Sequence, residues 1–203
     1  MSTLEFDSMP AAECYRWLTA LVTPRPIAWV STRSPDGVDN LAPFSFFQVV
    51  ADAPPTLMIG IGGTPDGSEK DTLRNLRARG ELVIHLVSNA MGPAMNATAA
   101  RLPPQESEFE HAGLARLPSA RVAPPRIAGA AVAFECALAE LMPYPREAPA
   151  SHVVFARVLL AHVDDAVLRD GRHVDPAKLD LIARLGGPLY TRTRDAFAMR
   201  RPE

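Results

Sequence analysis

Two short apolar segments interrupted by prolines constrain the fold of this chain most. Residues 24–32 read PRPIAWVST, and residues 40–47 read NLAPFSFF. The β-branched and aromatic residues of the first segment favour a strand, and the Ser-Pro-Asp-Gly sequence at residues 34–37 favours a turn. Pro43 has no N–H to donate to a sheet, so the second segment is expected to leave the sheet at an edge or a bulge. A bulged edge leaves backbone groups free to bind a flat polar ligand.

Short strands are predicted along most of the remaining chain. Further strands are expected at residues 56–61, 82–87, 132–138 and 152–163. Many short strands interrupted by a few helices favour a mainly β, α+β architecture over a doubly wound sheet, and they indicate a β-barrel with helical elaborations. The 203 residues are enough for one hydrophobic core. We therefore expect a single domain over residues 1–203, with residues 1–22 as an N-terminal helical extension.

Helix start and stop signals separate these strands. Helices are expected at residues 8–21, 71–79, 88–99 and 175–185. Ser8 is the expected cap of the first helix, Gly80 ends the second, and Gly186-Gly187 ends the last. Residues 102–128 are rich in proline and charge, so they are expected to form irregular surface structure.

Composition and charge exclude several classes of protein. The formal net charge is −2 and no long basic block is present, so nucleic acid is disfavoured as a partner. Cys14 and Cys136 lie far apart, without a CxxC motif, and they predict neither a disulfide framework nor a zinc site. His85 and His162 form no metal-like cluster, so no metal is expected. A secretory signal and a membrane-spanning apolar run are both missing from the sequence, which predicts a cytoplasmic protein without membrane association.

The segment Ser68–Thr72, with the sequence SEKDT, precedes an expected helix. The backbone N–H groups at a helix start favour an anion, and Lys70 adds a positive charge. This mixture suits a phosphate monoester, while the alternative is an ordinary helix start with Lys70 in solvent. No G-x-G-x-x-G motif follows a strand, so a Rossmann nicotinamide site is not predicted.

Four blocks of the sequence together resemble the flavin reductase-like family, which has an FMN-binding split barrel. The blocks are residues 24–47, residues 68–75 with the SEKDT motif, HVVFARV at residues 152–158, and LGGPLY at residues 185–190. They occur in the family's order and extend over nearly the whole chain. The resemblance is to the branch that contains flavoredoxin and the reductase components of flavin-dependent monooxygenases.

This resemblance implies FMN as the cofactor, bound by the residues that match the family's motifs. Residues implied to contact the phosphate are Ser68, Lys70, Asp71 and Thr72, and those implied to line the flavin ring are Asn40, Ala42, Pro43, Phe44 and Ser45. Ser45 has the alternative role of satisfying an edge-strand amide.

Four other residues are included as cofactor contacts, each with an alternative. Arg25 either pairs with the flavin phosphate or an acidic partner, or lies on the surface. Ser31 and Thr32 are possible phosphate-side donors at the end of their strand. Tyr190 either covers the flavin or a dimer neighbour, or belongs to the core.

His152 is the candidate catalytic residue. The matching histidine of the family lies near the flavin, where it would steer the nicotinamide or the ring, whereas a lone strand histidine is otherwise structural. Ala156 replaces a glycine that is frequent in the family. The added methyl group is expected to narrow the space for a reduced nicotinamide.

The resemblance implies a homodimer with the flavin at or near the subunit interface. It also implies an NAD(P)H-dependent flavin oxidoreductase, using NADH or NADPH, that supplies reduced flavin to a monooxygenase partner. The alternatives are a flavoredoxin-like electron-transfer protein without direct NAD(P)H use, and a flavin-binding barrel that acts on an unrelated small molecule. The apolar residues within segment 102–128, among them Leu114 and Ile127, are expected to contribute to the dimer contact.

Overall fold

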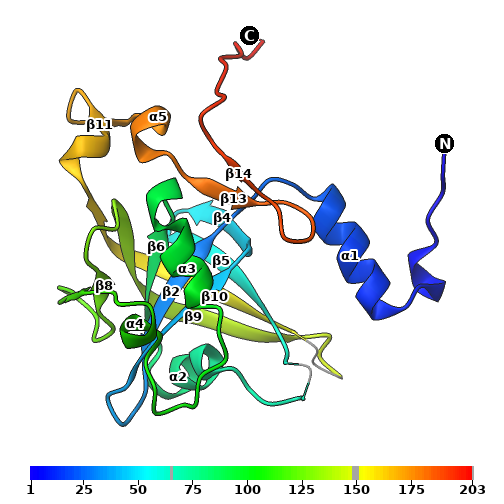
Figure 1. Ribbon diagram of the computed structural model, residues 1–203, viewed down its shortest axis with the longest axis horizontal. Helices are drawn as coiled ribbons and strands as arrows, with labels where there is room; N and C mark the ends of the chain where they lie inside the picture. Colours follow the sequence, from blue (N-terminus) through cyan, green and yellow to red (C-terminus); the bar gives the residue numbers. More distant parts are fainter. Residues whose placement is uncertain (65, 148–150, 203) are drawn as a thin grey trace.

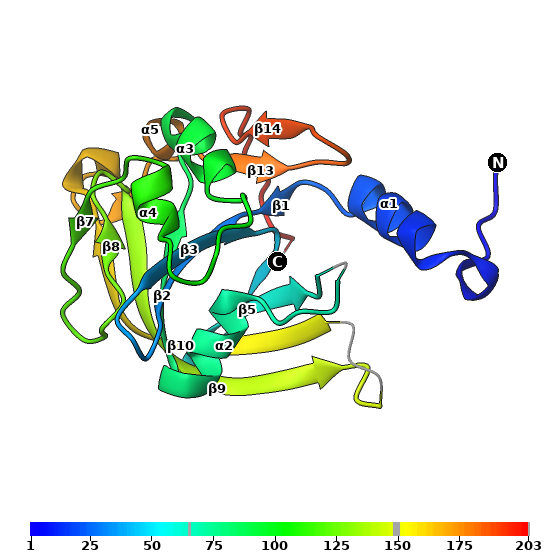
Figure 2. The same ribbon diagram turned by 60° about the horizontal axis from the view of Figure 1, so that its bottom comes forward.

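The computed structural model describes residues 1–64, 66–147 and 151–202 and consists of antiparallel sheets with short helices around them (Figures 1 and 2). Its strands are β1 (Arg25–Pro26), β2 (Ala28–Arg33), β3 (Asp39–Phe44), β4 (Phe46–Asp52), β5 (Pro55–Gly62), β6 (Glu81–Leu86), β7 (Arg116–Leu117), β8 (Arg126–Ile127), β9 (Val132–Tyr144), β10 (Ser151–Val163), β11 (Leu168–Arg169), β12 (His173–Val174), β13 (Ile182–Arg184) and β14 (Tyr190–Arg192). Its α-helices are α1 (Ala11–Leu21), α2 (Asp71–Arg79), α3 (Gly92–Ala97), α4 (Glu108–His111) and α5 (Pro176–Leu179). Three 3₁₀ turns, η1 (Phe6–Ser8), η2 (Asn89–Met91) and η3 (Asp165–Val167), complete the elements.

The main sheet has seven strands in the order β3-β2-β6-β9-β10-β5-β4. Its two edge strands, β3 and β4, follow each other in the chain and are separated only by Ser45. The sheet therefore curls until its edges are joined covalently, although β3 and β4 do not pair. Pro43 lies in the edge strand β3, as its missing N–H predicts.

The concave side of this sheet holds the largest hydrophobic cluster. It contains side chains from all seven strands and two leucines of α2: Ala28, Val30, Phe44, Phe47, Leu57, Ile59, Ile61, Leu73, Leu76, Leu82, Ile84, Cys136, Val154 and Ala156. Helix α2 begins and ends as predicted, with Gly80 in the left-handed conformation (φ 67°) that favours glycine at a helix end. The burial of Leu73 and Leu76 fixes α2 against the sheet, and it thereby fixes the residues that precede the helix.

Segment 102–128 differs from the expected irregular surface structure. It contains α4 and the small β7–β8 sheet, and it contributes Phe109 and Ile127 to a second cluster around Trp29. Leu114 packs against the same cluster. The expectation that Leu114 and Ile127 serve a dimer contact was wrong, because their side chains pack within the chain itself.

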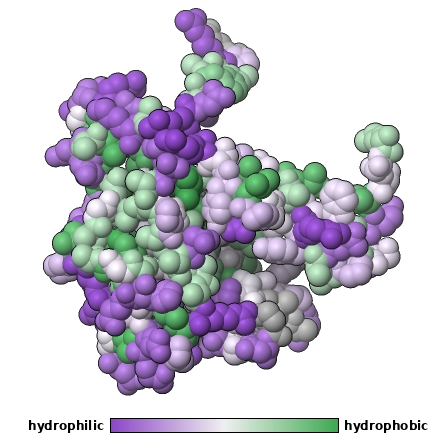
Figure 3. Space-filling model, in the orientation of Figure 1, coloured by the Kyte–Doolittle hydropathy of each residue, from purple (hydrophilic) through white to green (hydrophobic). Residues whose placement is uncertain are grey.

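The N-terminal helix projects from the body of the molecule (Figures 1 and 2), and Figure 3 shows this arm from the same side as Figure 1. The helix begins after Pro10 rather than at Ser8, which ends the preceding 3₁₀ turn. Tyr15 and Leu18 of this helix are exposed. None of the helices in the described residues is long and apolar enough to cross a membrane.

The last predicted helix is shorter than expected. Helix α5 ends at Leu179 because Asp180 adopts a left-handed conformation (φ 44°), and the chain then forms β13, which pairs with β1. Gly187 (φ 58°) therefore lies in the turn between β13 and β14 and does not cap a helix.

Candidate functional site

A pocket of about 590 Å³ opens between β3, the start of α2 and the segment after α3. It is lined by Asn40, Ala42, Pro43, Phe44, Gly63, Thr64, Asp66, Ser68, Glu69, Lys70, Asp71, Thr72, Arg74, Thr98, Ala99, Ala100, Arg101, Leu102, Pro104 and Glu108. Eight of the predicted cofactor contacts thus come together at one cavity, four from residues 40–44 and four from residues 68–72.

The outer edge of β3 forms one wall of the pocket, and α4 covers part of that edge. The Leu41 N–H donates to the Glu108 carboxylate (2.9 Å), and the Ser107 hydroxyl donates to the Asp39 carbonyl. Alternate residues of an edge strand point their backbone groups outward, so Pro43 stands at the next outward position, where no N–H is required. The strand therefore keeps its pairing with β2 and presents Pro43 at the pocket.

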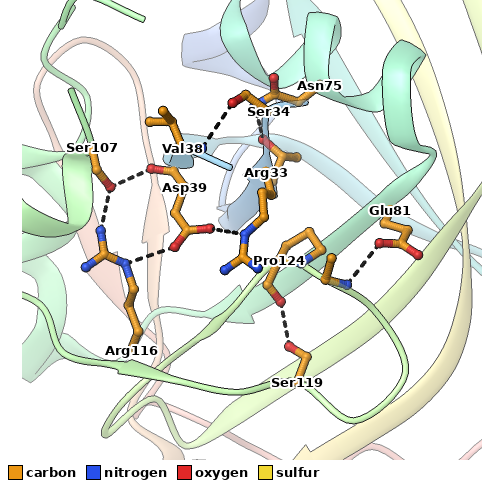
Figure 4. Close-up of polar contacts among 12 residues, drawn as sticks. Arg33, Ser34, Val38, Asp39, Asn75, Glu81, Ser107, Arg116, Ser119 and Pro124 are labelled. Atoms are coloured by element: carbon orange, nitrogen blue, oxygen red, sulfur yellow. Dashed lines mark hydrogen bonds and ion pairs between the residues drawn. The ribbon is translucent and has the colours of Figure 1, made fainter. Parts of the chain in front are cut away.

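An ion-pair network holds segment 102–128 against this wall (Figure 4). Asp39 receives the Arg33 Nε at 2.6 Å and the Arg116 Nε at 3.1 Å on its two carboxylate oxygens. Arg116 also donates to the Ser107 hydroxyl (2.9 Å). These contacts fix Ser107, and with it Glu108, relative to β3.

Helix α2 is attached to the same strands by two amide side chains. The Asn40 Nδ2 donates to the Thr72 hydroxyl (3.1 Å), and the Asn75 Nδ2 donates to the Thr32 hydroxyl (3.1 Å). All four residues are buried. The first turn of α2 is consequently held beside the pocket wall.

Positive charge gathers around Lys70. Its ammonium lies 5.5 Å from the centroid of the Phe44 ring, a cation–π distance. Burial lowers the pKa of Lys70, and the positive charge of Arg101 lowers it further. A partly buried ammonium with a second positive charge nearby favours an anionic ligand.

The loop before α2 supplies its own negative charge. Asp66 accepts hydrogen bonds from the Ser68 N–H (3.0 Å) and the Ser68 hydroxyl (2.7 Å). Hydrogen bonds from Ser68 and Thr64 hold the pKa of Asp66 well below its usual value. The Ser68 hydroxyl, at a residue that lines the pocket, is therefore engaged by Asp66.

Glu108 is an acidic residue buried in the pocket wall. Burial raises the pKa of its carboxyl group, and the hydrogen bond from the Leu41 N–H acts in the opposite direction. A carboxylate in this position offers an acceptor to hydroxyl or imide donors of a ligand.

A second pocket, of about 680 Å³, shares five residues with the first, including Lys70. Its other walls are the small residues Ala11 and Ala12 of α1, the end of β5 and His152 of β10. The predicted catalytic residue His152 therefore lies in a cavity that adjoins the predicted cofactor contacts.

The structure does not bring Arg25 to either pocket. Arg25 is buried, and its guanidinium donates to the carbonyls of Thr19 (2.5 Å), Val22 (2.7 Å) and Leu185 (3.0 Å). It thus ties the end of α1 to the β13–β14 turn, in place of either role considered from the sequence.

Ser31, Thr32, Ser45 and Tyr190 do not line these pockets either. Ser31 and Thr32 are fully buried in β2, where Thr32 accepts from Asn75. Ser45 joins the two edge strands. Tyr190 packs against the second core cluster, and the guanidinium of Arg184 lies 4.8 Å from its ring centroid.

Ala156 was wrongly expected to face the nicotinamide. Its side chain is fully buried in the main hydrophobic cluster, between partners Leu57 and Leu138 on the neighbouring strands. The methyl group fills the core of the curled sheet and lines neither pocket.

The sequence did not reveal several residues of the first pocket, notably Thr98, Arg101 and Glu108. Thr98 is buried and accepts a hydrogen bond from the Trp29 indole (2.8 Å). Arg101 is the fourth residue after α3, and a cation after a stretch of small residues gives no distinctive sequence signal. No group of metal-ligating side chains occurs within residues 1–64, 66–147 and 151–202.

Comparisons with known proteins identify a family and several solved structures that this chain resembles. The family profile described as "Flavin reductase like domain" matches residues 21–183. Nitrilotriacetate monooxygenase component B from Bacillus cereus is 33% identical, with a TM-score of 0.93 and coverage of 98% of each chain. The 2-nitrobenzoate 2-nitroreductase of Pseudomonas fluorescens is 27% identical, with a TM-score of 0.89 and coverage of 99% of this chain and 96% of the other.

A protein with a split barrel domain from Shewanella frigidimarina has the same fold. It is 22% identical, with a TM-score of 0.81 and coverage of 97% of this chain and 95% of the other. The expected α+β split barrel is thereby confirmed, with its split between β3 and β4.

Proposed function

The chain belongs to the flavin reductase-like family, and on this premise we propose that it is an NAD(P)H-dependent flavin oxidoreductase that binds FMN. The observation that carries the proposal is that one pocket combines a half-buried cation, Lys70, with the apolar strand edge Ala42–Phe44. An anionic phosphate and a flat ring are the two parts of FMN, and the cavity is within the range of about 300–1,000 Å³ typical of cofactor sites.

The residues at the start of α2 fit the phosphate. Lys70 and Arg101 supply positive charge, and the helix start supplies backbone donors. Asp66 lies close enough to Arg101 to feel its charge, so it is the internal counter-ion that a phosphate would replace. FMN is favoured over riboflavin by this arrangement.

The edge of β3 and the buried carboxylate of Glu108 fit the remainder of the cofactor. Ala42, Pro43 and Phe44 provide an apolar surface, and Glu108 provides a hydrogen-bond acceptor. When bound, FMN accepts a hydride and passes on its electrons, and the protein supplies binding, orientation and electrostatics.

We assign the second pocket to the reduced nicotinamide. It adjoins the first pocket through shared residues, and its walls at Ala11, Ala12, Gly62 and Gly63 carry little side-chain bulk. His152 lines this pocket and is the proposed contact of the nicotinamide ring.

A homodimer is supported by the exposed apolar face formed by α1 and β4. Tyr15 and Leu18 of α1 and Phe46, Val49 and Val50 of β4 are exposed. Tyr15 and Phe46 are in contact, with ring centroids 6.4 Å apart, so the two elements form one face. Open apolar strand edges are unfavourable in monomers, and a second copy would cover this one.

The similarity to a monooxygenase component B supports a flavin-dependent monooxygenase as the recipient of the reduced flavin. The similarity to a nitroreductase keeps a small-molecule acceptor as the second possibility. An electron carrier without nicotinamide use is the third outcome that an assay has to separate.

The visible spectrum of the purified protein and the oxidation of NADH and NADPH, each with and without added FMN, test the proposal. FMN-dependent oxidation of either nicotinamide is the expected result. A protein that retains FMN through gel filtration, oxidises neither nicotinamide and is reduced by a ferredoxin-like donor would be a carrier instead. A protein that shows no affinity for FMN would contradict the proposed function as a whole.

A further inference from the structure

Three charged and polar side chains form a chain from the loop before α2 to the second pocket. The Glu69 carboxylate accepts from the Arg77 Nε (2.9 Å), and the Arg77 Nη2 lies 2.9 Å from the His152 Nε2. Glu69 precedes Lys70 in sequence, Arg77 belongs to α2, and His152 belongs to β10. Arg77 therefore links the loop to the strand that carries the histidine.

This contact determines which ring nitrogen of His152 carries the proton. A guanidinium group has only donors and stays protonated in proteins, so the Nε2 atom must be the acceptor. The imidazole is then neutral, with its proton on Nδ1. Among the described residues, Nδ1 has no hydrogen-bond partner, so its N–H is available to a ligand.

The same chain also controls the charge around the pocket. The Glu69 carboxylate is paired with the Arg77 guanidinium at 2.9 Å. The negative charge of Glu69 is therefore neutralised, although the residue lines both cavities. Donors, namely Lys70 and His152, dominate the polar groups that remain for a ligand.

Building on the proposed flavin oxidoreductase function, we propose that Arg77 is a positioning residue that holds His152 as a hydrogen-bond donor toward the second pocket. The second pocket then selects a planar ligand that carries an acceptor group, such as the carboxamide oxygen of a nicotinamide. Small residues on the other walls leave room for the ring.

Long-range ¹H–¹⁵N correlation spectra of the ¹⁵N-histidine-labelled FMN-loaded protein test the tautomer directly. The His152 resonances are identified by their loss in His152→Asn. We expect a protonated Nδ1 and an unprotonated Nε2 in the wild type, and a mixture of both tautomers in Arg77→Met. A protonated Nε2 in the wild type, or an unchanged tautomer in Arg77→Met, would overturn the proposal.

Kinetics supply the functional arm, with Arg79→Met as the matched control. Arg79 lies on the same helix but donates to the Ser34 and Pro35 carbonyls. Loss of one positioned hydrogen bond should raise KM for the reduced nicotinamide about three- to tenfold in Arg77→Met and leave the Kd for FMN within about twofold. Equal effects of Arg77→Met and Arg79→Met on KM would refute the positioning role.

The two arms separate this proposal from the proposed function. A protein that oxidises neither nicotinamide would contradict the reductase activity, and the tautomer spectra would still decide the role of Arg77. A protein that oxidises nicotinamide with a protonated His152 Nε2 would retain the activity and refute the positioning role.

Discussion

Lys70 is the residue at which the charge and the apolar wall of the first pocket meet. Its ammonium lies over the Phe44 ring. Burial and the positive charge of Arg101 both lower the pKa of this ammonium group. A phosphate would satisfy this charge, whereas an uncharged ribityl chain would leave it unpaired. Substitution of this one side chain therefore tests whether the pocket binds a phosphate.

Lys70→Ala should weaken FMN about ten- to a hundredfold, since a charge-assisted contact is worth about 1.5–3 kcal/mol. Riboflavin, which lacks the phosphate, should lose far less. Flavin fluorescence titrations measure both affinities. Lys178→Ala changes the only other lysine of the chain, far from the pocket, and should leave both affinities unchanged. Equal losses for FMN and riboflavin in Lys70→Ala would refute the phosphate assignment.

Glu108 lines the pocket and also stabilises the fold, because its carboxylate accepts the hydrogen bond of the Leu41 N–H at the outer edge of β3. Glu108→Ala should lower the free energy of unfolding by about 1–3 kcal/mol, since this N–H loses its partner. Glu108→Gln retains an acceptor oxygen and should cost less than the alanine variant at pH 7. Urea unfolding measures both variants, and equal costs for them would show that the hydrogen bond is unimportant.

The raised pKa of Glu108 also predicts how the stability difference between Glu108→Gln and the wild type changes with pH. Because its pKa is raised in the folded state, the folded protein holds this proton at higher pH than the unfolded chain does. Stability from this group therefore falls as the pH rises through the raised pKa. The glutamine variant should compare more favourably with the wild type at pH 7 than at pH 4.

Individual residues were predictable only where a local motif carried the signal. The SEKDT and NLAPF sequences placed eight residues at the pocket, whereas Arg25 was misassigned because its carbonyl partners come from α1 and residue 185. Arg101 and Glu108 were missed because long-range packing, not a motif, brings them to the pocket.

At the scale of elements, several polar contacts fasten segment 102–128 to the main sheet. The Asp39–Arg116 pair holds its first part, and the buried Glu135 carboxylate accepts from the Ala120 (2.8 Å) and Arg121 (2.6 Å) N–H groups. The buried His85 accepts from the Ile127 N–H (3.0 Å) and binds the Trp29 carbonyl. The wall of the first pocket therefore depends on groups that titrate.

His85 should make the folded state sensitive to acid. Burial lowers its pKa from 6.5 to about 4, against the effect of the Trp29 carbonyl. The unfolded chain then binds a proton at higher pH than the folded protein does. The contribution of His85 to the free energy of unfolding is therefore complete above about pH 6.5. It falls by about 3 kcal/mol in total as the pH falls toward 4.

Urea unfolding at pH 7 and pH 4.5, at a fixed protein concentration, measures this loss. His85→Gln should be less stable at pH 7 but should lose about 2–3 kcal/mol less than the wild type between the two pH values. His173→Gln, a change on the exposed strand β12, serves as the control and should keep the wild-type difference. An unchanged difference in His85→Gln would rule out the proposed linkage.

Elements were predictable where the local pattern agreed with the packing. Helix α2 and strand β6 were predicted almost to the residue, since Gly80 separates them and their apolar spacing matches the burial. The predicted helix to Leu185 failed because residues 182–184 instead pair with β1, far away in sequence. Segment 102–128 was misjudged because its prolines and charges suggested irregular surface structure, although Phe109 and Ile127 are buried in the chain's own core.

At the scale of the whole molecule, the exposed face of α1 and β4 predicts the assembly. Sedimentation equilibrium at micromolar concentration should give twice 21.9 kDa. Val49→Glu should weaken the dimer at least about tenfold by placing a charge on this face. Val174→Glu on β12, outside the face, is the control and should leave the mass unchanged. A monomeric wild type that still holds FMN would refute this interface.

The position of Ser45 also has a consequence for the route by which the protein folds. Residues 44 and 46 are almost neighbours in the chain, yet five strands, drawn from residues 28–33 and 55–163, separate β3 from β4 across the sheet. Non-local pairings of this kind form slowly because chain entropy opposes them until many contacts exist. The junction of β3 and β4 at Ser45 cannot acquire its native shape before these strands are paired. Cofactor capture should accordingly be a late event in maturation, and newly synthesised chains with a defect in any of the five strands should emerge without flavin.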